Sequence, residues 1–215
     1  MTIAHPLLSR RPSPRMPSVA LLPNTHEMGL IQGRVHEATG PARRSFAIWL
    51  ATRLDGPVFW IAPPWMQERL NSDGLCPWID PARIIFVTPK RTEDLLWTME
   101  EVLRAGAAAL SIADLSGLPT LTQVRRMHLA AETGGKAGTH LPLGLLLTPG
   151  QGGAAGVETR WHLAPRHISG QDRWRLNRVR ARTSPHKSWE IERPAHTESL
   201  QIKTMLQTGQ SLPPH

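Results

Sequence analysis

The sequence predicts an α/β fold with a mostly parallel sheet, flanking helices and a C-terminal antiparallel extension. Short apolar runs of strand length alternate with amphipathic helical segments as far as residue 148. Three more strand-like segments follow, with no room for helices between them. The 215 residues suffice for one domain with tails, and two full domains are not expected.

The first predicted elements are a strand, a turn and a helix. Residues 33–37 favour a short strand. Two brief apolar runs, 58–61 and 84–87, are bounded by Pro and Asp and are typical of strands buried on both faces. Between the first strand and these runs, Gly40-Pro41 opens a helix whose apolar residues share one face: Ala42, Phe46, Trp49 and Leu50.

The middle of the chain continues this alternation. An amphipathic helix beginning near Thr92 is closed by Gly106, and the strand at 108–113 that follows ends at Asp114. The capping box Thr120-x-x-Gln123 opens a helix that runs through Glu132 and is stopped by Gly134-Gly135, before another buried strand at 143–147. Strand and helix therefore alternate in the order expected of a parallel sheet.

Three C-terminal segments, 159–164, 173–182 and 188–192, are expected to pair antiparallel. In the second of them, Trp174 and Leu176 share one parity and Val179 and Ala181 the other. A bulge near Asn177-Arg178 would turn both pairs towards the core and leave the arginines on the outer face. Six of the eight tryptophans lie on predicted elements and are expected in the core: Trp49, Trp60, Trp97, Trp161, Trp174 and Trp189.

Composition and charge set the expected domain boundaries. Lys and Arg number 25 against 17 Asp and Glu, so the net charge is +8, and 21 of the basic residues are arginine. Residues 1–28 favour a disordered basic tail, 29–193 the folded domain and 194–215 a second flexible tail. Residues 151–215 hold ten basic and five acidic residues, which favours anionic partners for this part of the chain.

Several classes of protein are excluded at this point. The chain lacks an apolar stretch of the roughly 18 to 20 residues that a membrane helix needs, and residues 1–23 lack the hydrophobic region of a secretory signal. A cytoplasmic protein without a membrane partner is therefore expected. The single cysteine, Cys76, excludes an internal disulfide and a Cys-rich zinc site, and the ten histidines lack ligand spacing, so no metal is expected.

The first predicted turn is where a nucleotide-binding protein places G-x-x-x-x-G-K-[ST], because backbone N–H groups and the lysine surround the phosphates together. Phe46 and Ala47 stand where the lysine and the magnesium-binding hydroxyl would be, so neither ATP hydrolysis nor a cofactor is expected. Arg43 and Arg44 either meet a phosphate at the helix N-terminus or form an exposed pair in its first turn. The candidate degenerate phosphate loop consists of Gly40, Pro41, Ala42, Arg43, Arg44 and Ser45.

Asp114 has the position of the aspartate that orients magnesium in such enzymes, the Walker B position, at the end of an apolar strand. The alternative is that it caps the next helix or turn. The strand at 58–61 leaves through Ala62-Pro63-Pro64, so no acidic residue follows it to activate a water. A further component of hydrolysis is therefore missing.

Four stretches carry a resemblance to a known family: Gly33-Arg34-Val35-His36-Glu37 with its Gly40-Pro41-Ala42 turn, residues 94–101 (DLLWTMEE), residues 125–132 (RRMHLAAE) and Thr159-Arg160-Trp161. In order and spacing the chain resembles the ImuA family, RecA-like accessory proteins of bacterial damage-induced mutagenesis. The resemblance covers about residues 29–193. It implies a RecA-like core with a degenerate phosphate loop.

The same resemblance implies a non-enzymatic adaptor in translesion DNA synthesis, expressed with the SOS response. Its implied partners are an ImuB-type polymerase-like protein and an error-prone polymerase, with RecA itself and DNA as further candidates. Two alternatives stay open: a RecA-like ATPase with an atypical nucleotide site, and a cell-division inhibitor of the SulA type. The missing lysine argues against the ATPase, and the long basic hairpin argues against the inhibitor.

The densest charge cluster lies in the second C-terminal strand. One interpretation is an edge hairpin in which Glu190 and Glu192 pair with arginines, and the other is a strip that binds DNA or docks a protein. Two glutamates cannot neutralise all of its arginines: Arg173, Arg175, Arg178, Arg180 and Arg182. The glycine-rich segment 148–156 holds no Lys, Arg or aromatic residue, which favours a flexible connector over a DNA-binding loop.

Overall fold

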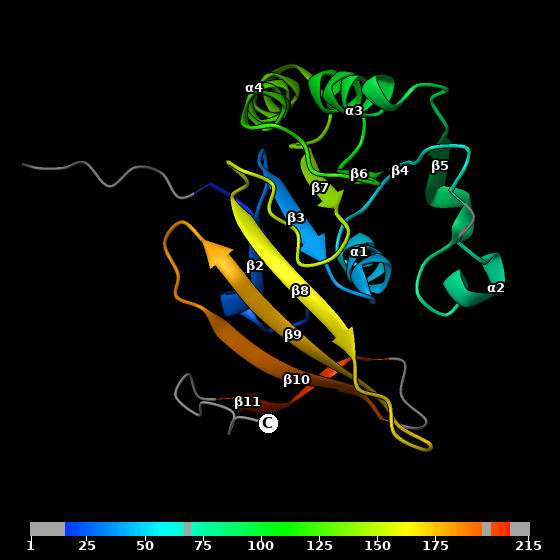
Figure 1. The fold of residues 1–215 in the computed structure, drawn as a ribbon, viewed down its shortest axis with the longest axis vertical. Helices are drawn as coiled ribbons and strands as arrows, with labels where there is room; N and C mark the ends of the chain where they lie inside the picture. Colours follow the sequence, from blue (N-terminus) through cyan, green and yellow to red (C-terminus); the bar gives the residue numbers. More distant parts are fainter. Residues whose placement is uncertain (1–15, 67–69, 195–198, 207–215) are drawn as a thin grey trace, which may run out of the picture.

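The structure is a computed structural model that describes residues 16–66, 70–194 and 199–206. Nine strands form one mixed sheet in the order β11-β10-β9-β8-β3-β7-β6-β4-β5 (Figure 1). The parallel strands are β3 (Val35–Thr39), β4 (Val58–Ile61), β5 (Ile84–Val87), β6 (Leu110–Asp114), β7 (Leu143–Leu147) and β8 (Thr159–Pro165). The antiparallel part consists of β9 (Asp172–Ala181), β10 (Lys187–Arg193) and β11 (Gln201–Leu206).

The helices lie on both faces of the sheet. They are α1 (Arg43–Ala51), α2 (Ser72–Leu75), α3 (Thr92–Ala105) and α4 (Leu121–Ala137), with short 3₁₀ turns η2 (His26–Met28) and η3 (Pro81–Arg83). Helix α1 connects β3 to β4, which lies nearer the β5 edge of the sheet. Helices α3 and α4 connect β5 to β6 and β6 to β7, in the opposite direction across the sheet. Because crossovers are right-handed, reversing the direction places α1 on one face and α3 with α4 on the other (Figure 1). The predicted α/β class, with parallel core and antiparallel extension, is confirmed.

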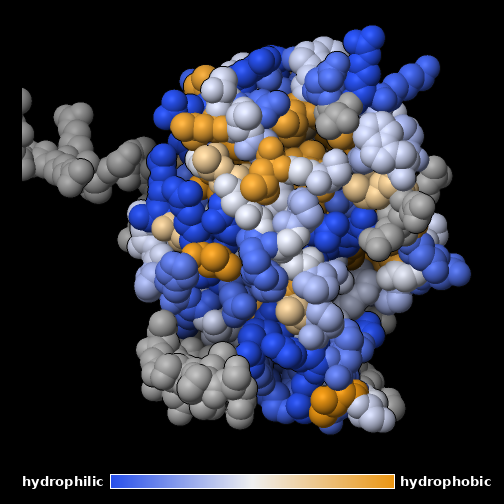
Figure 2. Space-filling model, in the orientation of Figure 1, coloured by the Kyte–Doolittle hydropathy of each residue, from blue (hydrophilic) through white to orange (hydrophobic). Residues whose placement is uncertain are grey.

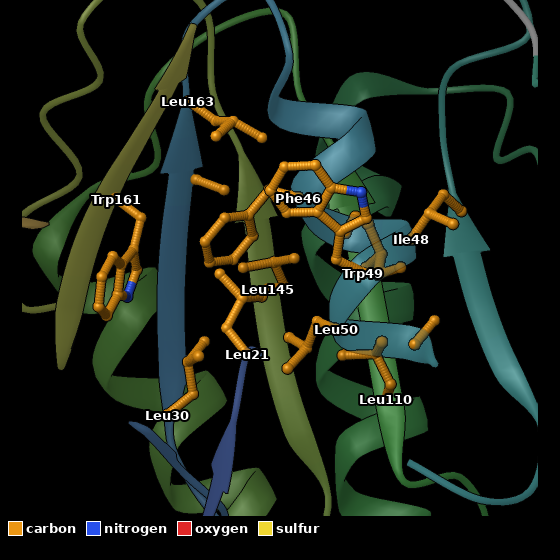
Figure 3. Close-up of a cluster of buried hydrophobic side chains, with 14 of the residues drawn as sticks. Leu21, Leu30, Phe46, Ile48, Trp49, Leu50, Leu110, Leu145, Trp161 and Leu163 are labelled. Carbon is orange, nitrogen blue, oxygen red and sulfur yellow. The ribbon is translucent and has the colours of Figure 1, made fainter. Parts of the chain in front are cut away.

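The larger core lies on the α1 face of the sheet. Figure 3 shows Phe46 and Trp49 projecting from α1 towards the strands. The ring of Phe46 lies 6.0 Å from that of Trp161, and Trp49 meets Trp174 edge-on at 5.0 Å. These aromatic contacts join α1 to β8 and β9, so the antiparallel extension shares one core with the parallel sheet.

The N-terminal segment closes this core, which differs from the tail expected at 1–28. Strand β1 (Ser18–Ala20) pairs antiparallel with β2 (Gly29–Ile31). Leu21, Leu22 and Met28 are buried in the α1-side core. Their burial removes apolar surface from water, which outweighs the breaks that prolines introduce. Residues 1–15 of the predicted tail lie outside the described residues.

Helix α4 passes the glycines at which it was expected to stop and continues to Ala137. A Cβ on Gly134 would lie 2.0 Å from the carbonyl oxygen of Leu103, so this glycine lets α4 approach α3 closely. The predicted capping box of Thr120 and Gln123 is confirmed. Gly106 ends α3 in the left-handed conformation (φ +59°), also as expected.

The predicted antiparallel pairing of the C-terminal segments is confirmed for β9 with β8 and with β10, although β8 also runs parallel to β3. The bulge falls at Val179, because Arg160 pairs with Arg180 while the next residue, Trp161, pairs with Arg178. Strand β11 lies within the segment expected to be a flexible tail and pairs with β10. The β9–β10 hairpin is therefore interior to the sheet rather than its edge. Residues 195–198 and 207–215 lie outside the described part.

Trp97 is the exception among the tryptophans expected in the core, since 58% of its surface is exposed. The stripe of α3 that faces the sheet consists of Leu95, Met99 and Leu103, and Trp97 lies on the other side of the helix. The other five are buried as predicted. In the part of the chain that the structure describes, no helix combines the length and the hydropathy needed to cross a membrane.

Candidate functional site

The carboxyl ends of β3 and β6 bring the candidate phosphate loop and Asp114 together. Only β7 lies between these two parallel strands, so both end at the same edge of the sheet. Helix α1 begins just beyond β3, and its first turn reaches across to Asp114. The structure brings Asp114 within reach of the first turn of α1, but the contacts there differ from those of a nucleotide site.

Asp114 is held by an arginine of α1. Its carboxyl group is only 1% exposed, and Arg44 Nε donates to Oδ2 at 2.6 Å. Arg43 Nε lies 3.8 Å from the other oxygen, Oδ1. Both arginine side chains are largely buried, at 21% and 20% exposure, so neither belongs to an exposed pair. A guanidinium therefore lies against the carboxylate that would orient magnesium in an ATPase, and Asp114 binds α1 instead of capping the next turn.

The turn before α1 is too short and too fully bonded to surround a phosphate. Only Gly40, Pro41 and Ala42 separate β3 from α1. The Ala42 N–H donates to the Leu163 carbonyl at 3.1 Å, and the Arg43 N–H donates to the Gly40 carbonyl at 3.2 Å. Phosphate loops leave such N–H groups to the ligand. Strand β8 thus satisfies the turn from within the protein.

Gly40 is required by this arrangement. Its φ is +89°, and an added Cβ would lie 2.5 Å from the carbonyl oxygen of Leu163. The sequence signal that suggested a phosphate loop, a glycine after a strand, therefore has a packing cause. It lets the turn press against β8.

Glu37 forms a second polar cluster, which the sequence did not reveal. This carboxylate on β3 is fully buried. Its Oε1 accepts bonds from Thr148 Oγ1 (2.6 Å) and from the N–H groups of Gly153 (2.9 Å) and Ala154 (3.1 Å). Arg160 Nε donates to the other oxygen. The glycine-rich segment 148–156 is therefore tied to β3, which differs from the flexible connector expected.

Two histidines beside this cluster are structural. His36 is buried, with Nδ1 2.7 Å from Thr159 Oγ1 and Nε2 2.9 Å from the Ile31 carbonyl. Burial lowers the pKa of His36 to about 4, so the ring is neutral at pH 7. His128 Nδ1 accepts the Val35 N–H at 3.3 Å, and burial also lowers the pKa of His128. Among the described residues, no three His, Cys, Asp or Glu side chains are grouped to hold a metal ion.

The four stretches that carry the resemblance contact one another around β3. Arg34 pairs with Glu132 of α4, and the Val35 N–H is bonded by His128 of the same helix. Glu37 pairs with Arg160 of β8. The remaining stretch, on α3, is joined to α4 by Glu100 and Arg126, 2.9 Å apart. Each of the four stretches, spread over residues 33–161, therefore contacts at least one other through a polar pair.

The arginines of β9 do not form one outward strip. Arg178 points inward with Trp174 and Leu176 and is only 6% exposed. Its guanidinium lies over Trp161 and Trp189, at 5.8 and 5.4 Å from the ring centres. It donates to the carbonyl oxygens of Glu27 and Pro185. Burial lowers the pKa of this guanidinium.

The other arginines of the hairpin differ in how well they are paired. Arg173 lies 3.6 Å from Glu192 and Arg175 lies 3.3 Å from Glu190, the pairing that one of the two interpretations of the hairpin expected. Arg182 is 72% exposed and 3.9 Å from Glu158. Arg180 is exposed and has no ion pair within the described residues. Among the arginines of the hairpin, the positive charge that the glutamates leave unpaired therefore lies at the end of β9. Hydrophilic residues cover most of the face over β8–β10 (Figure 2).

No family model matches this chain, and no curated protein matches its sequence. Its fold and site define an α/β protein whose own side chains occupy the carboxyl ends of the parallel strands, where such a sheet usually binds ligands.

Proposed function

We propose that this chain is a non-enzymatic, RecA-like accessory protein of damage-induced mutagenesis. In this proposal it acts in the cytoplasm during the SOS response, with an ImuB-type polymerase-like protein and an error-prone polymerase, in translesion DNA synthesis. The observation that carries the proposal is the contact of Arg44 with Asp114 at the edge of a sheet that is otherwise ordered like a phosphate-binding one. A RecA-like core with that edge closed works by binding rather than by turnover.

The energetics of the closed edge support an adaptor. A nucleotide with magnesium at Asp114 would have to displace Arg44, and removing one partner of a buried ion pair costs about 3–5 kcal/mol. The three-residue turn offers few free N–H groups to offset that cost, since those of Ala42 and Arg43 are already bonded. Phe46, at the lysine position, is buried in the α1-side core.

The polar contacts between the four stretches support the resemblance. A chance likeness in four separate stretches would give no reason for them to touch. Here each stretch contacts another through its charged or polar residues, as in the pairs Arg34–Glu132 and Glu37–Arg160.

The first test separates an adaptor from an ATPase. Purified full-length protein with Mg²⁺ and ATP is expected to release no phosphate above the buffer rate. Asp114→Asn and the matched surface control Asp55→Asn should give the same result, because Asp55 is exposed and follows the opposite end of α1 from the turn. Sustained hydrolysis that Asp55→Asn keeps and Asp114→Asn loses would overturn the adaptor and favour the RecA-like ATPase.

The second test concerns the biology. Deleting the gene in its own host should lower the frequency of damage-induced mutations, and the wild-type gene should restore it. Arg180→Glu tests the exposed end of β9, with Arg91→Glu as a control of equal charge change on an exposed side chain far from β9. An unchanged mutation frequency in the deletion strain would refute the proposal, and cells that keep dividing after damage, where the wild type stops, would favour the SulA-type inhibitor.

A further inference from the structure

The outer surface of the α3–α4 layer exposes two large apolar side chains. Trp97 on α3 is 58% exposed and Leu129 on α4 is 63% exposed. The inner faces of both helices are occupied by the smaller core, which contains Leu95, Met99 and Met127. The two helices lie side by side at one end of the molecule in Figure 1, and none of the other helices and strands drawn there lies over their outer side. Exposed apolar residues on neighbouring helices mark a candidate contact surface.

The two helices carry opposite charge. Helix α3 holds four acidic residues and one basic residue, a net charge of −3, whereas α4 holds three basic residues and one acidic residue, a net charge of +2. Part of this charge is used within the chain, as in the pair Glu100–Arg126. Asp94 and Arg125 have no ion pair within the described residues. The surface therefore has an acidic side and a basic side.

Such a surface is complementary to itself. Each of the two helices runs between parallel strands, so α3 and α4 run in the same direction. A two-fold axis parallel to the helices, between them and in the plane of contact, places α3 of one copy on α4 of the other. The acidic helix then meets the basic helix twice.

We propose that the outer surface of α3 and α4 is the interface of a homodimer, with a second copy of this chain as its occupant. The relative height of the helices supports specific contacts. The contacts between α3 and α4 join residues 26 to 31 apart, from Glu100–Arg126 to Leu103–Gly134, so Arg125, 28 residues from Trp97, lies at about its level. Arg125 of the second copy then lies over the Trp97 ring, one turn from Asp94 on one side and from Glu101 on the other.

The size of the surface sets the expected strength. At 1.5 Å per residue, helices of 14 and 17 residues are about 21 and 26 Å long, so the pair offers roughly 500 Å² per copy. A total of about 1,000 Å² lies at the low end of specific interfaces. The dimer should therefore be reversible, with a dissociation constant on the order of micromolar. This inference does not depend on the proposed function.

The test exchanges the charges that meet across the axis. Sedimentation velocity of the full chain from about 1 to 200 μM should show a monomer–dimer equilibrium near the expected strength. Asp94→Lys and Arg125→Glu, each alone, place like charges opposite each other twice and should weaken the dimer tenfold or more. An equimolar mixture of the two variants brings opposite charges together at both contacts, so the heterodimer should form about as well as the wild-type dimer.

Controls keep the outcome interpretable. Asp55→Lys, outside the two helices, should leave the dimer unchanged, and circular dichroism should report the same fold for every variant. A wild-type chain that is monomeric at all these concentrations would overturn the proposal, whether or not another protein binds this surface. So would a dimer indifferent to both substitutions, for example one joined through the exposed edge strand β5, or a mixture that fails to associate.

Discussion

Replacing Glu37 by Gln should destabilise the protein far more than its conservative size suggests. The carboxylate accepts four bonds, from Thr148, Gly153, Ala154 and Arg160, without exposure to water. An amide keeps one acceptor oxygen and turns an NH₂ group towards a donor. Arg160, whose side chain is only 15% exposed, then loses its charged partner. Breaking one side of a buried pair costs about 3–5 kcal/mol, so a loss of about 3 kcal/mol or more is expected.

Two measurements check this. Urea unfolding followed by tryptophan fluorescence gives the free energy of unfolding, and hydrogen exchange reports the Gly153 and Ala154 amides, which should lose protection. Glu101→Gln is the matched control, because that carboxylate is 43% exposed and pairs at the surface with Arg104. It should change the free energy of unfolding by less than about 1 kcal/mol. An equally small effect of Glu37→Gln, with both amides still protected, would refute the role assigned to Glu37.

Three further predictions concern stability. Burial lowers the pKa of His36 from 6.5 to about 4, so as the pH falls this histidine is protonated in the unfolded chain before it is protonated in the folded one. The stability present above pH 6.5 should therefore decline by about 3 kcal/mol between pH 6.5 and 4. Urea unfolding across this range should show a shallower decline for His36→Asn than for the wild type. Gly40→Ala should lower the free energy of unfolding by more than about 1 kcal/mol, because φ is +89° and the Leu163 carbonyl is too close; a melting temperature equal to that of the wild type would contradict this. Removal of residues 195–215 deletes β11 and should lower the melting temperature modestly. Removal of residues 171–215 also takes Trp174, Trp189 and Ile191 out of the core and should abolish cooperative unfolding. Identical melting curves for the two truncated proteins would show that the antiparallel extension does not share the core.

Local patterns in the sequence determined the main architecture. The alternation of short apolar runs with amphipathic helices predicts the parallel sheet, because strands covered by helices on both faces are apolar throughout and the helices repeat their apolar residues every 3.6 positions. The capping box at Thr120 and the closing glycine Gly106 are similarly local, since every atom involved lies within one turn. The sequence alone also shows that Phe46 stands at the position of the phosphate-loop lysine.

Tertiary structure decided what the polar residues do. Arg44 and Asp114 are 70 residues apart, and Glu37 lies 117 residues from the Ala154 amide, so no local pattern couples them. Arg178 faces inward because the bulge falls one residue later than parity suggested and because Trp161 and Trp189 flank its guanidinium. Strand β11 forms because β10 offers a row of unpaired backbone groups. Periodicity encodes which side of an element is buried, whereas the partner of a buried charge depends on which distant elements the packing brings within a few ångströms.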